Sequence, residues 1–186
     1  MNLKNDLELK MALMTILLSF LSFTSPSLPS TRGILNQKAP AWKVKEWLNL
    51  PAGKPSLEIT DFKGKVIYLY CFQAWCPGCH AHGFPTLQEV IREFKDDPDV
   101  AIIAVQTTFE GFAHNGLKQA REVAKRYSLD IPVGQSGTRR EHSKLMASYR
   151  NGGTPWTIII DKEGIVRYND FHIAPANAIK VIQRLK

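Results

Sequence analysis

Residues 66–85 of this chain read VIYLYCFQAWCPGCHAHGFP. Residues 66–72 form an unbroken apolar run, which is typical of a strand buried on both faces of a sheet. Cys76 and Cys79 follow at a two-residue spacing, and Pro77 between them suits the first turn of a helix. A helix N-terminus presents free N–H groups and a positive dipole end, which lower the pKa of a thiol placed there. The stretch therefore predicts a strand, a reactive cysteine pair and a helix in direct succession.

Strand-like and helix-like segments alternate through the rest of the chain. Apolar runs predict strands at residues 66–72, 100–105, 131–135, 157–160 and 165–168. Apolar residues at helical spacing predict helices over residues 87–94, 117–127, 141–149 and 176–185. Such alternation, after one or two short N-terminal strands, predicts a mainly parallel sheet with helices on both faces. A closing hairpin around Gly164 adds an antiparallel edge, so we expect an α/β/α sandwich with a mixed central sheet.

The amino-acid composition excludes several classes of protein but does not indicate a function. The chain has 186 residues, a formal net charge of +7 and three cysteines. So few cysteines exclude a small fold held by disulfides, and the near-average composition excludes collagen-like and coiled-coil structures. Cys71 lies inside the apolar run, where a lone cysteine packs as a small apolar side chain. No nucleic-acid motif accompanies the positive charge, so we expect no nucleic-acid partner.

The first thirty residues differ in character from the rest of the chain. Lys4 and Lys10 precede an apolar segment at residues 11–23, and a stretch rich in Ser and Pro follows it. A basic start, a short apolar centre and small residues after it are typical of a secretory signal peptide. An uncleaved membrane tether through residues 11–23 is the alternative, because no charge occurs between Lys10 and Arg32.

These patterns divide the chain into three parts. Residues 1–30 are predicted to be a signal peptide or N-terminal membrane anchor, residues 31–37 a linker, and residues 38–186 a single folded domain. We expect the domain to be exported, either to the periplasm or to the membrane surface that faces it. A translation start at Met11 or Met14, or an unstructured N-terminus, is the competing interpretation.

Two motifs resemble a known family. The sequence WCPGC after a buried strand, and GTPWTIIIDKEG at residues 153–164, resemble thioredoxin-fold redoxins, and especially the TlpA/ResA-like disulfide reductases. The resemblance covers residues 38–186 and implies a thioredoxin-like fold. It also implies that Cys76 is the attacking nucleophile and that Cys79 is the resolving thiol, in a thiol–disulfide exchange that needs no metal or organic cofactor.

The resemblance assigns supporting roles to residues on both sides of the cysteine pair. Trp75 would shield the pair, and Pro77 and Gly78 would complete the active-site turn. The backbone of Thr154 would dock an extended substrate chain, and Pro155, in the cis form, would face the disulfide. The implied partners are a protein disulfide or dithiol substrate and an electron-donor oxidoreductase.

The chain departs from the family pattern near the second cysteine. His82 stands where relatives often carry a Glu, and Pro85 lies one residue later than the corresponding proline. Tyr70 stands where cytosolic thioredoxins carry a carboxylate. Because both usual acids are missing, we hypothesise that His82, or as second choice His80, transfers the proton at Cys79, since a histidine pKa near 6.5 suits this task. A solvent-facing helix histidine is the competing interpretation of His82.

Other functions share some of these residues. Cys76, Cys79 and His80 spell the C-x-x-C-H signature of c-type haem attachment, although a haem also needs an apolar pocket and a second axial ligand. Peroxiredoxins place Pro and Thr ahead of their cysteine, whereas Leu69 and Gln73 hold those positions here. A zinc site would lack a second cysteine pair. A non-catalytic binding module is disfavoured by the intact C-x-x-C. Outside the motif, His114 and Asn115 are expected to lie in a loop and to cap the helix that follows them.

Overall fold

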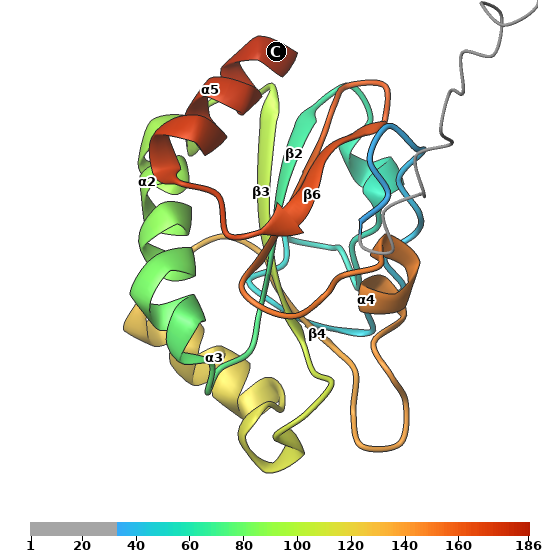
Figure 1. Cartoon of the computed structure of the whole chain (residues 1–186), viewed down its shortest axis with the longest axis vertical. Helices are drawn as coiled ribbons and strands as arrows, with labels where there is room; N and C mark the ends of the chain where they lie inside the picture. The colour runs from blue at the N-terminus through green and yellow to red at the C-terminus, as the bar shows by residue number, and fades with distance from the viewer. Residues whose placement is uncertain (1–32) are drawn as a thin grey trace, which may run out of the picture. The chain divides into compact units, whose positions relative to one another are not determined.

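The computed structural model describes residues 33–186, and the predicted signal peptide or anchor lies outside the described residues (Figure 1). Residues 33–37 of the predicted linker belong to the folded unit, because Gly33 N donates to Arg150 O at 3.0 Å and Ile34 is buried. Over residues 33–186, the structure contains no helix with the length and apolar character needed to cross a membrane.

A mixed sheet of six strands, in the order β1-β4-β3-β2-β5-β6, forms the centre of the domain. The strands are β1 (Glu46–Leu48), β2 (Val66–Phe72), β3 (Val100–Thr107), β4 (Val133–Ser136), β5 (Trp156–Ile160) and β6 (Val166–Phe171). β2, β3 and β4 are parallel, whereas β1 pairs antiparallel with β4, and β5 pairs antiparallel with β2 and β6. The predicted mixed sheet and its antiparallel hairpin are confirmed.

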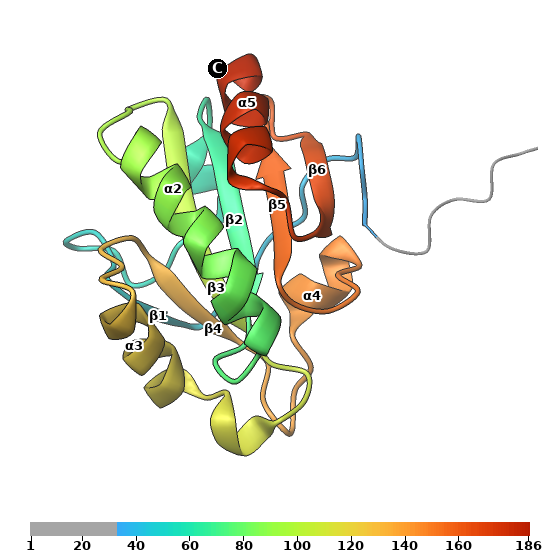
Figure 2. The same cartoon turned by 60° about the vertical axis from the view of Figure 1, so that its left-hand side comes forward.

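Helices cover both faces of the sheet (Figures 1 and 2). One face carries α2 (Phe84–Phe94), α3 (Leu117–Arg126) and α5 (Pro175–Leu185), and the other carries α4 (Lys144–Tyr149) together with the N-terminal segment. Alternate side chains of β2 supply both cores: Tyr70 and Phe72 pack toward α2, and Leu69 and Cys71 pack toward α4. Helix α4 is shorter than predicted, because the Ser143 hydroxyl caps its first turn by accepting from Met146 N.

A π-helical turn, Cys79–Gly83, connects the cysteine motif to α2. The helix as a whole starts at Pro77, as the sequence predicted, and changes from π to α geometry at Phe84. A π turn closes one residue later than an α turn. The π turn therefore adds one residue to the helix between Cys79 and the start of α2 at Phe84.

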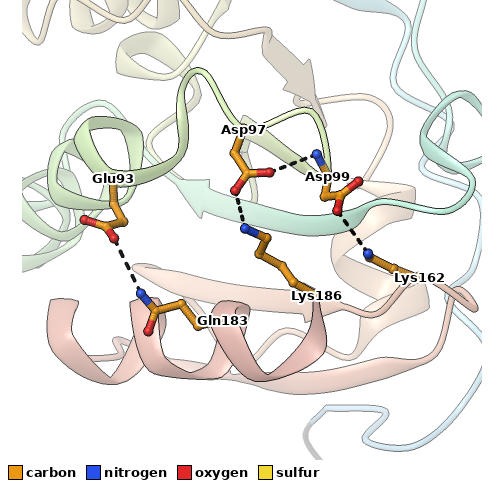
Figure 3. Close-up of polar contacts among 6 residues, drawn as sticks. All are labelled: Glu93, Asp97, Asp99, Lys162, Gln183 and Lys186. Atoms are coloured by element: carbon orange, nitrogen blue, oxygen red, sulfur yellow. Dashed lines mark hydrogen bonds and ion pairs between the residues drawn. The ribbon is translucent and has the colours of Figure 1, made fainter.

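Polar contacts close the amino end of the sheet (Figure 3). Asp97 pairs with Lys186 and accepts from Asp99 N at 3.0 Å, and Lys162 Nζ pairs with Asp99 at 3.2 Å. Gln183 on α5 donates to Glu93 on α2 at 3.4 Å. The Asp97–Lys186 pair ties the end of the chain after α5 to the turn before β3, and the Gln183–Glu93 bond ties α5 to α2. All of them lie near water, which weakens ion pairs.

Candidate active site

The cysteine pair lies at the carboxyl end of β2, where the chain turns into a helix. Cys76 N donates to Gln73 O at 3.1 Å, which closes the turn between strand and helix. Cys79 N donates to Cys76 Sγ at 3.2 Å, and the Cys76 thiol donates to Thr154 O at 3.6 Å. Cys76 therefore occupies the helix N-terminus, as the sequence predicted.

The two sulfurs of the motif have opposite acidity. The hydrogen bond from the Cys79 thiol is the largest cause that lowers the pKa of Cys76, to about 6, and Thr154 and the N–H groups of Cys79 and Gly78 add to it against the effect of burial. Burial raises the pKa of Cys79 far above its ordinary value, and the neighbouring Cys76 sulfur raises it further. These shifts favour the thiolate on Cys76 and the thiol on Cys79.

The three cysteines also differ in how much of each side chain is exposed. Cys76 is 8% exposed, whereas Cys71 and Cys79 are fully buried, and all three are free thiols. Burial raises the pKa of Cys71 to about 12. Cys71 also points to the opposite face of the sheet from the other two. Cys71 is a core residue, and Cys76 is the one of these three cysteines that combines a lowered pKa with some exposed surface.

The predicted supporting residues lie around Cys76. They are Trp75, Pro77, Gly78, Thr154 and Pro155. The Thr154–Pro155 peptide bond is cis, and a Cβ placed on Gly78 would lie 3.3 Å from Pro155 Cδ, so the proline packs on the turn between the cysteines. Trp75 is 47% exposed beside the pair. The structure thus brings together two segments that are far apart in the sequence.

The two candidate proton-transfer histidines have different surroundings. His80 Nδ1 lies 2.7 Å from Tyr127 Oη, and His80 Nε2 lies 2.7 Å from Ala74 O. His82 is exposed, and its ring centre lies 5.5 Å from that of His172. Among the described residues, neither histidine is hydrogen-bonded to a cysteine sulfur. The proton-transfer role of His82 or His80 stays a prediction.

The same contacts bear on the haem and metal alternatives. Both ring nitrogens of His80 are hydrogen-bonded, and Cys79 has no exposed surface through which to attach a porphyrin. Within residues 33–186, no group of three or more His, Cys, Asp or Glu side chains is placed to hold a metal ion.

A buried amide network beneath the motif was missed by the sequence analysis. Asn115 Nδ2 donates to Gln73 Oε1 at 3.1 Å, and Ala74 N donates to Gln106 Oε1 at 3.0 Å. Gln106 Nε2 donates to Gln135 Oε1 at 2.6 Å. The prediction that Asn115 caps α3 is wrong, because its side chain turns inward to brace the active-site turn. The available signal was a glutamine, Gln106, directly after the apolar run of β3.

Comparisons with known proteins agree with this geometry. The model of the AhpC/TSA family matches residues 35–169. The chain is 30% identical over 111 residues to the thiol-disulfide oxidoreductase ResA of Bacillus cereus, covering 59% of this chain and 57% of that protein. The Bacillus subtilis protein of the same name is 29% identical over 111 residues, covering 59% and 55%. The chain thus spans a little over half the length of these curated relatives.

Solved structures extend the similarity to the fold. A thioredoxin-like superfamily protein matches with a TM-score of 0.72 and 31% identity, covering 80% of this chain and 95% of that one. A thiol-disulfide isomerase from Corynebacterium glutamicum matches with a TM-score of 0.69 and 28% identity, covering 79% and 96%. Since the family model covers most of the chain and the fold agrees, the chain belongs to the AhpC/TSA family and has its thioredoxin-like fold.

Proposed function

We propose that this protein is a thiol–disulfide oxidoreductase in which Cys76 attacks and Cys79 resolves. The observation that carries the proposal is the difference between the two sulfurs: the pKa of Cys76 is lowered to about 6, while that of Cys79 is raised. A thiolate is the nucleophile in disulfide exchange, and a neighbouring protonated thiol can complete the reaction. The names of the related Bacillus and Corynebacterium proteins support the same activity.

The proposed reaction proceeds through a mixed disulfide. The Cys76 thiolate attacks one sulfur of a substrate disulfide, and the other substrate sulfur leaves as a thiolate that takes up a proton. Cys79 then loses its proton and attacks Cys76 Sγ, which displaces the second substrate sulfur. Two electrons pass to the substrate, and a Cys76–Cys79 disulfide remains. Trp75, Pro77, Gly78, Thr154 and Pro155 form the surroundings in which the substrate chain docks.

The direction of electron flow is proposed to be reduction of protein disulfides outside the cytoplasm. Residues 1–30 support export, and a tether through residues 11–23 would hold the domain at the membrane. A separate electron-donor oxidoreductase must then restore the Cys76 and Cys79 thiols. The reduction potential of the pair tests the direction. A value close to the roughly −120 mV of the strong oxidant DsbA contradicts a reductase.

His82, with His80 as second choice, is proposed to transfer the proton at Cys79. His82 lies in the same π turn as Cys79 and faces solvent, so it can exchange protons with water. The test is the pH dependence of Cys76 alkylation in a His82→Ala variant. An unchanged profile rejects this role.

Reduction of insulin by dithiothreitol, followed as the turbidity of the released B chain, tests the activity directly. We expect the wild-type protein to accelerate the reaction and the Cys76→Ser variant to fall to the uncatalysed rate. A Cys71→Ala variant is the matched control, because it removes a buried cysteine from the other face of the sheet. Full activity in a Cys76→Ser/Cys79→Ser variant rejects the proposal and favours a binding role.

A further inference from the structure

Tyr70 has a buried hydroxyl group without a full hydrogen bond. The residue lies on β2 and is 1% exposed. Its ring stacks on Phe72, with ring centres 6.0 Å apart, and meets Phe84 edge-on at 5.3 Å. No described residue meets the geometry of a full hydrogen bond with Tyr70 Oη, although the Cys79 side chain interacts with it. Because an unsatisfied buried hydroxyl costs free energy, and phenylalanine would fill the same space without this cost, the hydroxyl calls for an explanation.

The hydroxyl is directed at the π turn that begins with Cys79. A Cβ placed on Gly83, the last residue of that turn, would lie only 1.9 Å from Tyr70 Oη. The phenol oxygen therefore packs directly against the backbone of Gly83. Tyr70 and Cys79 also belong to the same buried cluster. Burial, together with the adjacent Cys79 sulfur, raises the pKa of Tyr70 well above its ordinary value, so the phenol stays protonated and can donate a hydrogen bond.

Cys79 needs such a donor when the disulfide opens. Burial and Cys76 raise the pKa of Cys79, the Gln73 backbone and the Thr154 side chain lower it through hydrogen bonds, and none of these groups is a cation. A thiolate that forms on this fully buried sulfur would be poorly solvated. A donor that already points to the place where charge develops stabilises that charge without reorganisation.

We propose that the Tyr70 hydroxyl donates a hydrogen bond to the Cys79 thiolate whenever the Cys76–Cys79 disulfide opens or closes. This inference rests on the proposed function. In the opening step, a dithiol thiolate bonds to Cys76 Sγ, the Cys76–Cys79 bond breaks, and its electron pair passes to Cys79 Sγ. Tyr70 keeps its proton throughout, and Cys79 then takes up a proton by the route proposed above, through His82 or, as second choice, His80. The hydroxyl already lies beside Cys79 in the dithiol state and has a charged acceptor in the thiolate state.

Single-turnover reduction of the oxidised protein by excess dithiothreitol at pH 7 tests this role. Acid quenching, alkylation and mass spectrometry follow the loss of the disulfide. We expect Tyr70→Phe to slow disulfide opening about five- to tenfold, because a hydrogen bond to a charged group is lost and leaving-group effects are partly expressed in the rate.

Tyr68→Phe is the matched control. Tyr68 lies on the same face of β2, is fully buried, and also has an Oη without a full hydrogen bond among the described residues. Its electrostatic neighbours are Thr157, Tyr168 and Cys71 instead of Cys79. We expect this variant to open its disulfide at the wild-type rate. Both substitutions keep the ring and remove an unsatisfied hydroxyl, so both variants should fold, as circular dichroism will show.

A second reaction distinguishes a donor to Cys79 from a general structural effect. In a Cys79→Ala background, Cys76 is loaded with glutathione, and dithiothreitol then releases it without any charge forming at position 79. Here we expect Tyr70→Phe to have no effect. Equal slowing of both reactions overturns the proposal, and so does a wild-type rate in the first reaction. If the wild-type protein itself cycles no disulfide, the proposed function fails as well, which separates the two failures.

Discussion

The polar groups at the two ends of the central sheet differ in their exposure to water. At the amino end, Asp97 and Lys186 pair at the surface, where water reaches both partners (Figure 3). At the carboxyl end, Cys76, Cys79 and Tyr70 are buried and take part in no ion pair. Water stabilises charge at the first end, so the protein has little to add there. At the carboxyl end, water is largely excluded, so hydrogen bonds from neighbouring protein groups determine which side chain is charged.

A lowered pKa therefore has different consequences at the two ends. The hydrogen bond from Lys186 lowers the pKa of Asp97, but a surface carboxylate is ionised at neutral pH in any case. The pKa of Cys76 is lowered to about 6, mainly by the Cys79 thiol, and this shift turns a thiol into a thiolate at neutral pH. The comparison indicates that reactivity depends on local burial and hydrogen bonding, and not on the overall charge of +7.

Removal of the resolving thiol should have the largest effect at the carboxyl end. We expect a Cys79→Ser variant to lose catalytic turnover while Cys76 still attacks, because the mixed disulfide can no longer be displaced from within. Non-reducing electrophoresis and mass spectrometry should show the substrate trapped on Cys76. A Cys76→Ser variant should trap nothing. Normal turnover in Cys79→Ser contradicts the proposed division of roles.

Gly83→Ala should disrupt the packing of Tyr70 against the π turn. Gly83 has helical angles, φ −67° and ψ −50°, so alanine would otherwise be favoured there. Its Cβ would collide with the Tyr70 phenol, and we expect a loss of about 3 kcal/mol in the free energy of unfolding. Urea denaturation measures this loss.

A double-mutant cycle shows whether that loss comes from Tyr70. In a Tyr70→Leu background, which lacks the phenol, Gly83→Ala should cost far less. A Gly83→Ala protein as stable as the wild type would show that the close approach of the two residues is relieved at no cost.

Asp97→Asn at the amino end should have the smallest effect. The Asp97 pKa is lowered in the folded state, so its contribution to stability is present above the unfolded pKa of about 3.9 and is lost as the pH falls through the folded value. We expect a small shift of the urea midpoint at pH 7 that disappears in acid and in 1 M salt, with unchanged Cys76 alkylation. A changed alkylation rate would show that the two ends are coupled.

The sequence predicted the parts of the site that depend on local order. The apolar run of β2, the C-x-x-C spacing and Pro77 were sufficient for a strand, a cysteine pair beside it and a helix, and the placement of these parts is confirmed. The reactivity of the pair stays a prediction. The burial of Cys71 also followed from the apolar run around it.

Contacts between distant segments could not be predicted from the local pattern. The contact between Tyr70 and Gly83 depends on how closely α2 approaches β2. That distance cannot be predicted from the spacing of residues in the sequence. The inward turn of Asn115 likewise depends on Gln73, 42 residues earlier in the chain. The π turn Cys79–Gly83 also became visible only in the structure.

The most direct test of the central claim is the pH dependence of alkylation in the reduced native protein, with each cysteine identified by mass spectrometry. Deprotonation increases with pH, so we expect labelling of Cys76 by iodoacetamide to rise through a midpoint at about pH 6 and then level off. Cys79 and Cys71 should stay unlabelled over the same range. A Cys76 midpoint near the ordinary thiol value of about 8.5, or labelling of Cys79 before Cys76, would contradict the assignment.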